Sequence, residues 1–176
     1  MCNVSRREPI GLLCFSVIRI GLLSTLLIAQ SLAHADTLTG RVVRVTDGDT
    51  IVILDSANAQ HKIRLTGIDA PERKQAFGTK SKEHLSESVA GKFVLVDYNK
   101  CDRYERILGK VLLNDEDMNL EQVRAGMAWH YKKYQKEQTP SDRELYSKTE
   151  IEAREARRGL WYDAEPMPPW EYRRMK

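Results

Sequence analysis

Three stretches near the start of the chain show the hydrophobic patterns of β-strands. Residues 38–45 are rich in β-branched side chains, residues 50–54 are almost entirely apolar, and residues 61–66 alternate polar with apolar positions. Turn-forming residues separate them, with Asp-Gly at 47–48 and a polar run at 55–60. The pattern therefore predicts a meander of three antiparallel strands.

Helical spacing and two further strands follow this meander. Apolar residues at helical spacing predict a helix over residues 71–90, and residues 92–98 and 107–113 are typical of strands. A short helix is expected with Asn119 as its N-cap, and a last one begins at Thr139, where a proline occupies the first turn. Periodicity alone thus predicts an α+β protein with five short strands and about three helices.

The first 35 residues have the composition of an export signal. A basic N-terminal stretch precedes the apolar run Ile20–Ala29, and Ala33–Ala35 fits a small-x-small cleavage site. A membrane anchor over residues 10–33 is the alternative, but Arg19 would lie near mid-membrane at a cost of about 2.5–3.5 kcal/mol. We therefore expect a cleaved signal peptide and a protein that is periplasmic or secreted, without stable membrane association; an uncleaved leader would leave it tethered.

Length and charge restrict the remaining possibilities. The whole chain carries 28 Lys+Arg and 25 Asp+Glu, and without its first 35 residues it keeps 25 and 24, a net charge of +1. This balance excludes a histone-like polycation, so any contact with nucleic acid must depend on where the charges lie. The remaining length suits one domain, and we expect a monomer. The expected parts are a signal peptide (1–35), a folded domain (36–164) and a C-terminal tail (165–176).

Charged side chains gather at the ends of the predicted strands. Each has an ordinary structural explanation: Asp47 can form a hairpin turn, Asp69 and Glu72 can cap a helix, and Arg106 can pair with a neighbouring carboxylate such as Asp102. Together they indicate chemistry, because hard oxygen ligands suit Ca²⁺, arginine forks suit phosphate, and a further carboxylate can orient or deprotonate water. These are the groups that hydrolysis of a phosphodiester requires.

Five stretches resemble the staphylococcal (micrococcal) nuclease family, also called thermonucleases, and the first three are a specific signal in their order and spacing. They are VTDGDT at 45–50, RLTGIDAPE at 64–72, DRYER at 102–106, NLEQVRAGMA at 119–128 and ARRGLW at 156–161. The resemblance covers residues 38–161 and implies a five-stranded β-barrel of the OB type with about three packed helices. Periodicity does not by itself predict that the sheet closes into a barrel.

The resemblance also implies roles for individual residues. Asp49 and Asp69 correspond to the carboxylates that hold one Ca²⁺, and the backbone carbonyl of Ala70 to a further ligand. Glu72 corresponds to the general base or water-orienting residue. The two arginines that clamp the phosphate correspond to Arg64 and Arg106.

Several aromatic residues are candidates for contact with the nucleotide, and one residue departs from the family's pattern. Tyr104 matches an aromatic position near the nucleotide, whereas the family's stacking tyrosines align only loosely with Tyr131 and Tyr134, and Trp129 could also serve. Packing under the last helix is an equal alternative for these rings. Glu105 stands where the type member has glycine, and strand alternation predicts that its side chain points away from the cleft.

The hypothesis from the sequence is an exported, Ca²⁺-dependent phosphodiesterase. The resemblance implies cleavage of DNA and RNA, preferentially single-stranded or frayed, with low sequence specificity and 3′-phosphate products. The alternative is a non-catalytic OB-type module that binds single-stranded nucleic acid. The joint presence of Asp49, Arg64, Asp69, Glu72 and Arg106 favours the enzyme, because a binding module does not need the whole set.

Overall fold

The computed structural model describes residues 36–175, so the expected signal peptide lies outside the described residues. Their strands are β1 (Asp36–Asp47), β2 (Thr50–Leu54), β3 (Gln60–Leu65), β4 (Ile68–Asp69), β5 (Phe93–Cys101), β6 (Ile107–Leu113), β7 (Glu116–Asp117) and β8 (Trp129–His130). Their helices are α1 (Gly78–Val89), α2 (Met118–Arg124), α3 (Pro140–Glu155) and α4 (Pro169–Tyr172), with 3-10 turns η1 (Lys132–Glu137), η2 (Gly159–Tyr162) and η3 (Arg173–Met175). Within this range no helix is long and apolar enough to cross a membrane.

The five long strands close into a barrel. They run in the order β3-β2-β1-β5-β6 with antiparallel neighbours, and β3 then pairs in parallel with β6, opposite Ile107–Gly109. Strand alternation sends every second side chain inward, so Ile51, Ile63 and Val96 are fully buried in the core. The five-stranded OB-type barrel that the resemblance implied is confirmed.

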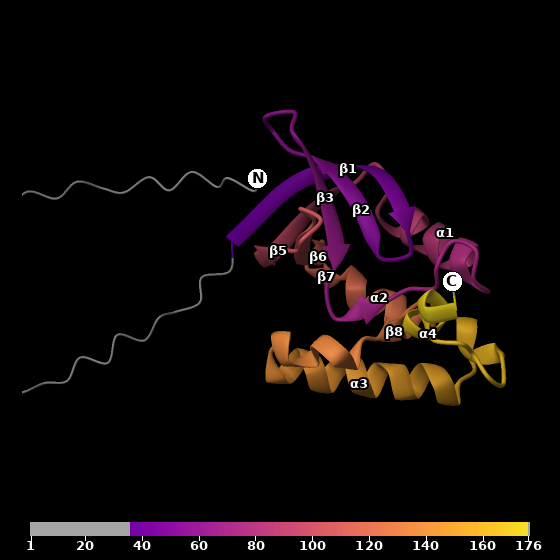
Figure 1. Ribbon diagram of the computed structural model, residues 1–176. Helices are drawn as coiled ribbons and strands as arrows, with labels where there is room; N and C mark the ends of the chain where they lie inside the picture. The colour runs from indigo at the N-terminus through magenta and orange to yellow at the C-terminus, as the bar shows by residue number, and fades with distance from the viewer. Residues whose placement is uncertain (1–35, 176) are drawn as a thin grey trace, which may run out of the picture.

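Helices cover one side of the barrel (Figure 1). The long helix α3 runs beneath the strands in this view and contacts α2 and β8. It begins at Pro140, directly after Thr139, as predicted, and Thr139 caps it, with its hydroxyl oxygen accepting a hydrogen bond from the amide of Asp142 at 3.1 Å. A second apolar cluster forms there, with Trp129 and Trp161 in edge-to-face contact at a ring-centroid distance of 4.3 Å.

The first helix begins later than predicted. Helix α1 starts at Gly78, not at residue 71, and Phe77 ahead of it takes a left-handed conformation with φ of 64°. The predicted cap by Asp69 and Glu72 is therefore wrong. Asp69 instead belongs to β4, where its backbone pairs with Trp129 of β8, and residues 71–77 form a non-helical segment with turns before the helix.

The cap of the second helix was also predicted wrongly. Asp117 caps α2, because its Oδ1 accepts hydrogen bonds from the amides of Asn119 and Leu120, each at 3.0 Å. Asn119 lies inside the helix with its side chain fully buried. Its side-chain amide instead binds backbone carbonyl groups of the barrel, as described below.

The C-terminal segment returns to the barrel. Residues 163–168 are non-helical, and Pro169 begins the short helix α4, which Figure 1 shows in yellow between α3 and the end of the barrel near α1. Trp170 of α4 stacks on Tyr131 with a ring-centroid distance of 5.4 Å and an interplanar angle of 19°. This contact holds the segment beside β8.

Candidate active site

Two buried carboxylates meet at one end of the barrel. Asp49 lies in the turn between β1 and β2, and Asp69 ends β4; their exposed fractions are 6% and 0%. Asp47 forms the expected turn, with its Oδ1 accepting from the amide of Asp49 at 3.3 Å. Gly48 is required there, because a Cβ at this position would lie 1.8 Å from the hydroxyl of Ser81 in α1. The turn therefore packs directly on that helix.

Arg64 joins the two carboxylates. It lies on β3 opposite Thr50, and its guanidinium contacts Asp49 Oδ2 at 2.7 Å and Asp69 Oδ1 at 2.9 Å. The amide of Ala70 donates to Asp49 Oδ2 at 2.8 Å. Residues from three separate strand ends thus converge on one charged cluster. The carbonyl of Ala70, which the resemblance assigned to a cation, keeps that role as a prediction.

Asp49 is in an unusual electrostatic environment. Burial raises the pKa of Asp49 to about 7; Arg64 opposes the shift, and the nearby carboxylates Asp47 and Asp69 add to it. An acid buried near other carboxylates is costly to ionise unless positive charge is close. The cluster therefore favours any further cation that can reach it.

A residue that the sequence did not indicate supplies such a charge. Arg173, in η3, places its Nη2 2.6 Å from Asp69 Oδ2 and its Nη1 2.8 Å from Glu72 Oε1. Burial acts to lower the pKa of Arg173, but its hydrogen bonds to Asp69 and Glu72 outweigh this and raise it. Glu72 is thus linked to the cluster through the C-terminal segment, and no periodicity or motif marks an arginine in that tail.

Arg106 lies in the loop between β5 and β6. Its Nε and Nη2 contact Asp102 Oδ2 at 2.8 and 2.7 Å, while Asp102 Oδ1 accepts from the amides of Tyr104 and Arg106 at 2.8 and 3.0 Å. Burial acts to raise the pKa of Asp102, but these hydrogen bonds lower it below its ordinary value. The structure therefore ties Arg106 to its own loop, beside the point where β6 pairs with β3.

Glu105 corrects an expectation about this loop. It is exposed and its φ is 59°, the left-handed region that favours glycine, and it belongs to a turn and not to a strand. Strand alternation therefore does not decide where its side chain points. The glycine that the resemblance places at this position fits the same backbone conformation.

The candidate stacking residues have different environments. Tyr104 is 63% exposed, and the Arg106 guanidinium carbon lies 5.5 Å from its ring centroid. Tyr131 is half-buried against Trp170, whereas Tyr134 is 46% exposed. Trp129 is 8% exposed and packs in the second apolar cluster, so packing accounts for this ring.

Two buried amides of α2 hold the loops that carry the carboxylates. Asn119 Nδ2 donates to the carbonyl oxygens of Thr66 and Gly109 at 3.0 and 3.1 Å. Gln122 Nε2 donates to the carbonyl of Gly48 at 2.6 Å, next to Asp49. Both side chains are buried, so losing either would leave unpaired carbonyl groups. The sequence predicted Asn119 as a helix cap and did not indicate this role for either side chain.

The donor set is compatible with a hard divalent cation. Within residues 36–175, no group of three or more His, Cys, Asp and Glu side chains is arranged to hold a metal ion. Asp49 and Asp69 nevertheless offer two carboxylates, and Ca²⁺ completes its six to eight ligands with carbonyl oxygens and water. A cation at Asp69 requires the Arg173 guanidinium to leave the same oxygens. Arg64 also binds Asp49 Oδ2 and Asp69 Oδ1, so the residues fit Ca²⁺ when the cation shares these two carboxylates with Arg64.

Comparison with known proteins identifies the family of this chain. Residues 62–163 match the model of the family described as "Staphylococcal nuclease homologue". A protein named "Uncharacterized endonuclease" from Escherichia coli is 49% identical, over 78% of this chain and 86% of its own. A protein named "Micrococcal nuclease" from Shigella flexneri is 39% identical, over 86% of this chain and 88% of its own. On the family match and these identities, the chain belongs to the staphylococcal nuclease family.

Proposed function

We propose that this protein is an exported nuclease that uses one Ca²⁺ to hydrolyse phosphodiester bonds of DNA and RNA, leaving 3′-phosphate ends. Membership of the family, with relatives named as an endonuclease and as a micrococcal nuclease, supports a nuclease function. The convergence of Asp49, Arg64 and Asp69 within ion-pair distance at the end of the barrel is the observation that carries the proposal.

Different side chains of the protein perform different parts of the proposed reaction. Arg64 and Arg106 bind the phosphate, because guanidinium forks match its oxygens and donors aimed at developing charge favour the transition state. Asp49 and Asp69 hold Arg64 in orientation by its two nitrogens. Glu72, which is partly exposed, orients or deprotonates the attacking water.

The cation would be held by Asp49, Asp69 and the carbonyl of Ala70. It would neutralise charge that grows on the phosphoryl oxygens. Asp49 is buried beside Asp47 and Asp69, which raises its pKa, and this environment favours added positive charge at this point.

Low sequence specificity follows from the kinds of group available. Arginines and a cation contact phosphate, and exposed tyrosines such as Tyr104 and Tyr134 can stack on any base. Neither contact reads base edges, and an unpaired base stacks more readily than one in a duplex. The proposed substrate is therefore single-stranded or frayed DNA or RNA, acted on by a monomer.

Cleavage with end-group analysis tests the proposal. The purified protein without residues 1–35 is incubated with single-stranded DNA or RNA, in Ca²⁺ or in EGTA, and the product termini are identified. Cleavage in Ca²⁺ alone, with phosphate on the 3′ ends, is the expected result. Binding without cleavage under both conditions would instead support the single-strand binding module, and equal cleavage in EGTA would contradict a calcium enzyme.

A further inference from the structure

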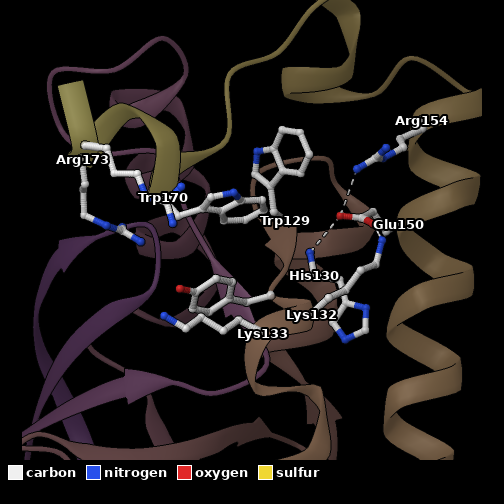
Figure 2. A pocket seen from close by; sticks show the side chains of 10 residues that line it. Trp129, His130, Lys132, Lys133, Glu150, Arg154, Trp170 and Arg173 are labelled. Carbon is white, nitrogen blue, oxygen red and sulfur yellow. Dashed lines mark hydrogen bonds and ion pairs between the residues drawn. The ribbon is translucent and has the colours of Figure 1, made fainter.

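A cavity of about 580 Å³ lies next to the carboxylate cluster. It is enclosed by β8 and the start of η1 on one side, by α3 on another, and by the C-terminal segment α4–η3 (Figure 2). Residues that line it include Trp170, Arg173 and Arg174, which lie beyond residues 62–163 matched by the family. The C-terminal segment therefore builds a cavity that the shared part of the fold does not make alone.

The cavity carries an excess of positive charge. Glu150 is the one carboxylate among its lining residues, and its oxygens are already bound by the amide of His130 at 3.0 Å and by Lys132 at 2.8 Å. Figure 2 shows these contacts on the side formed by α3. Lys133 and Arg174 also line the cavity, and both are exposed to solvent. A ligand entering it meets cations that Glu150 does not neutralise.

Aromatic rings form the opposite wall. Tyr131 and Trp170 stack nearly parallel, and Trp129 meets Trp170 edge-on with ring centroids 5.4 Å apart. Figure 2 shows Trp170 and Trp129 beside each other among the side chains that line the cavity, with Lys133 nearby. Aromatic rings interleaved with Lys and Arg are the combination that binds single-stranded nucleic acid, through base stacking and phosphate attraction.

Arg173 connects this cavity to the proposed reaction centre. It lines the cavity and at the same time contacts Asp69 and Glu72. A chain of nucleotides whose phosphate lies at the carboxylate cluster therefore has the cavity beside it. The volume falls in the range of pockets that hold small organic ligands.

We propose that this cavity binds a nucleotide of the single-stranded substrate adjacent to the phosphodiester that is cleaved, with its base against Trp170 and its phosphate at Lys133 and Arg174. The adjacency to cleavage rests on the proposed nuclease function. The C-terminal segment is thus part of the substrate-binding surface, and it adds contacts to the single strand beyond the scissile phosphate.

Equilibrium binding without cleavage tests this subsite. Fluorescence anisotropy of a labelled oligothymidylate is measured in EDTA, over a range of NaCl concentrations, for the wild type and for Lys133→Ala, Arg174→Ala and Trp170→Leu. Lys148→Ala is the matched control, because Lys148 is an exposed lysine of α3 that does not line the cavity. Circular dichroism checks folding, and the two exposed charge variants keep the test valid if Trp170→Leu fails to fold.

The expected result is specific to the cavity. Lys133→Ala and Arg174→Ala should each weaken binding about threefold or more and reduce the slope of log affinity against log salt by about 1. Trp170→Leu should weaken binding about fivefold or more through lost stacking. The control should match the wild type. Cavity variants that bind like Lys148→Ala would overturn the proposal.

Cleavage assays on the same proteins separate this inference from the proposed function. If the cavity variants bind more weakly but no protein, including the wild type, cleaves in Ca²⁺, the nucleotide site stands and the nuclease proposal fails. If the wild type cleaves and the cavity variants bind and cleave equally well, the nuclease proposal stands and the subsite is wrong. Raised KM for single strands in the cavity variants places the site on the path of the cleaved strand.

Discussion

Arg64 shows how a single side chain organises the site. It bridges Asp49 and Asp69 from a strand between them, so its removal would take one ion-pair partner from each carboxylate. These three residues were predictable, because each stands at the end of a strand within a short motif whose residue types suit phosphate and cation. Arg173 was not, since it lies 101 positions from Glu72 and only the folded tail brings them together.

Arg106→Ala should lower turnover about 10²-fold, because it removes one donor aimed at charge that develops in the transition state. The loop should keep its shape, since Asp102 still accepts hydrogen bonds from the amides of Tyr104 and Arg106. Steady-state kinetics on single-stranded DNA measure the effect. Arg103→Ala, which removes the same charge from the same loop, should lose much less. Turnover of Arg106→Ala close to that of the wild type would remove this arginine from the mechanism.

Arg173→Ala should tighten Ca²⁺ binding by about threefold to tenfold, because the cation no longer has to displace a guanidinium from Asp69 and Glu72. Isothermal titration calorimetry on the protein alone gives the dissociation constants. Arg174→Ala serves as the control, since it removes an equal charge from the same turn without touching those oxygens. Equal affinities for the two variants, or weaker binding by Arg173→Ala, would contradict competition at this site.

Among the elements, the strands of the barrel followed from periodicity, whereas the start of α1 and the cap of α2 did not. Inward-facing residues at every second position determine the barrel strands, and Thr139 with its following proline marked the start of α3. The start of α1 depends on β4 pairing with β8, a contact between residues 60 positions apart in the chain. Asparagine is a common N-cap residue, but the buried side-chain amide of Asn119 donates hydrogen bonds to the carbonyl oxygens of Thr66 and Gly109 instead. Tertiary contacts overrode local preference in both cases.

The junction between α2 and η2 depends on a close backbone approach. The carbonyl of Gly126 accepts a hydrogen bond from the amide of Leu160 at 2.8 Å. A Cβ at Gly126 would lie 2.2 Å from the carbonyl oxygen of Arg158, and the φ of 67° is unfavourable for other residues. Gly126→Ala should therefore destabilise the protein by about 2 kcal/mol or more.

Gly91→Ala is the control for that variant. Gly91 also has a positive φ of 75°, but a Cβ there meets no atom within 4 Å. Its substitution should cost about 1 kcal/mol, through backbone conformation alone. Urea unfolding followed by circular dichroism gives both values. Equal destabilisation by the two substitutions would show that the close backbone approach between α2 and η2 does not exclude a side chain at position 126.

For the whole molecule, the near-balanced charge does not reveal where nucleic acid binds. The fold brings together the cationic side chains proposed to bind nucleic acid: Arg64 comes from the barrel, Lys133 from the segment after β8, and Arg173 from the tail. The C-terminal segment closes one side of this surface by packing Trp170 on Tyr131. Composition could exclude a polycation, but only the three-dimensional arrangement shows a basic and aromatic surface around the carboxylates.

The central claim is that the carboxylates and arginines at the end of the barrel form one hydrolytic site. The most direct measurement is the single-turnover cleavage rate of single-stranded DNA by Glu72→Gln in saturating Ca²⁺, with Ca²⁺ affinity determined on the same preparation. We expect a rate at least about 10²-fold below that of the wild type, with little change in Ca²⁺ affinity, because the amide cannot accept a proton from water. A folded Glu72→Gln protein that cleaves at the wild-type rate would contradict it.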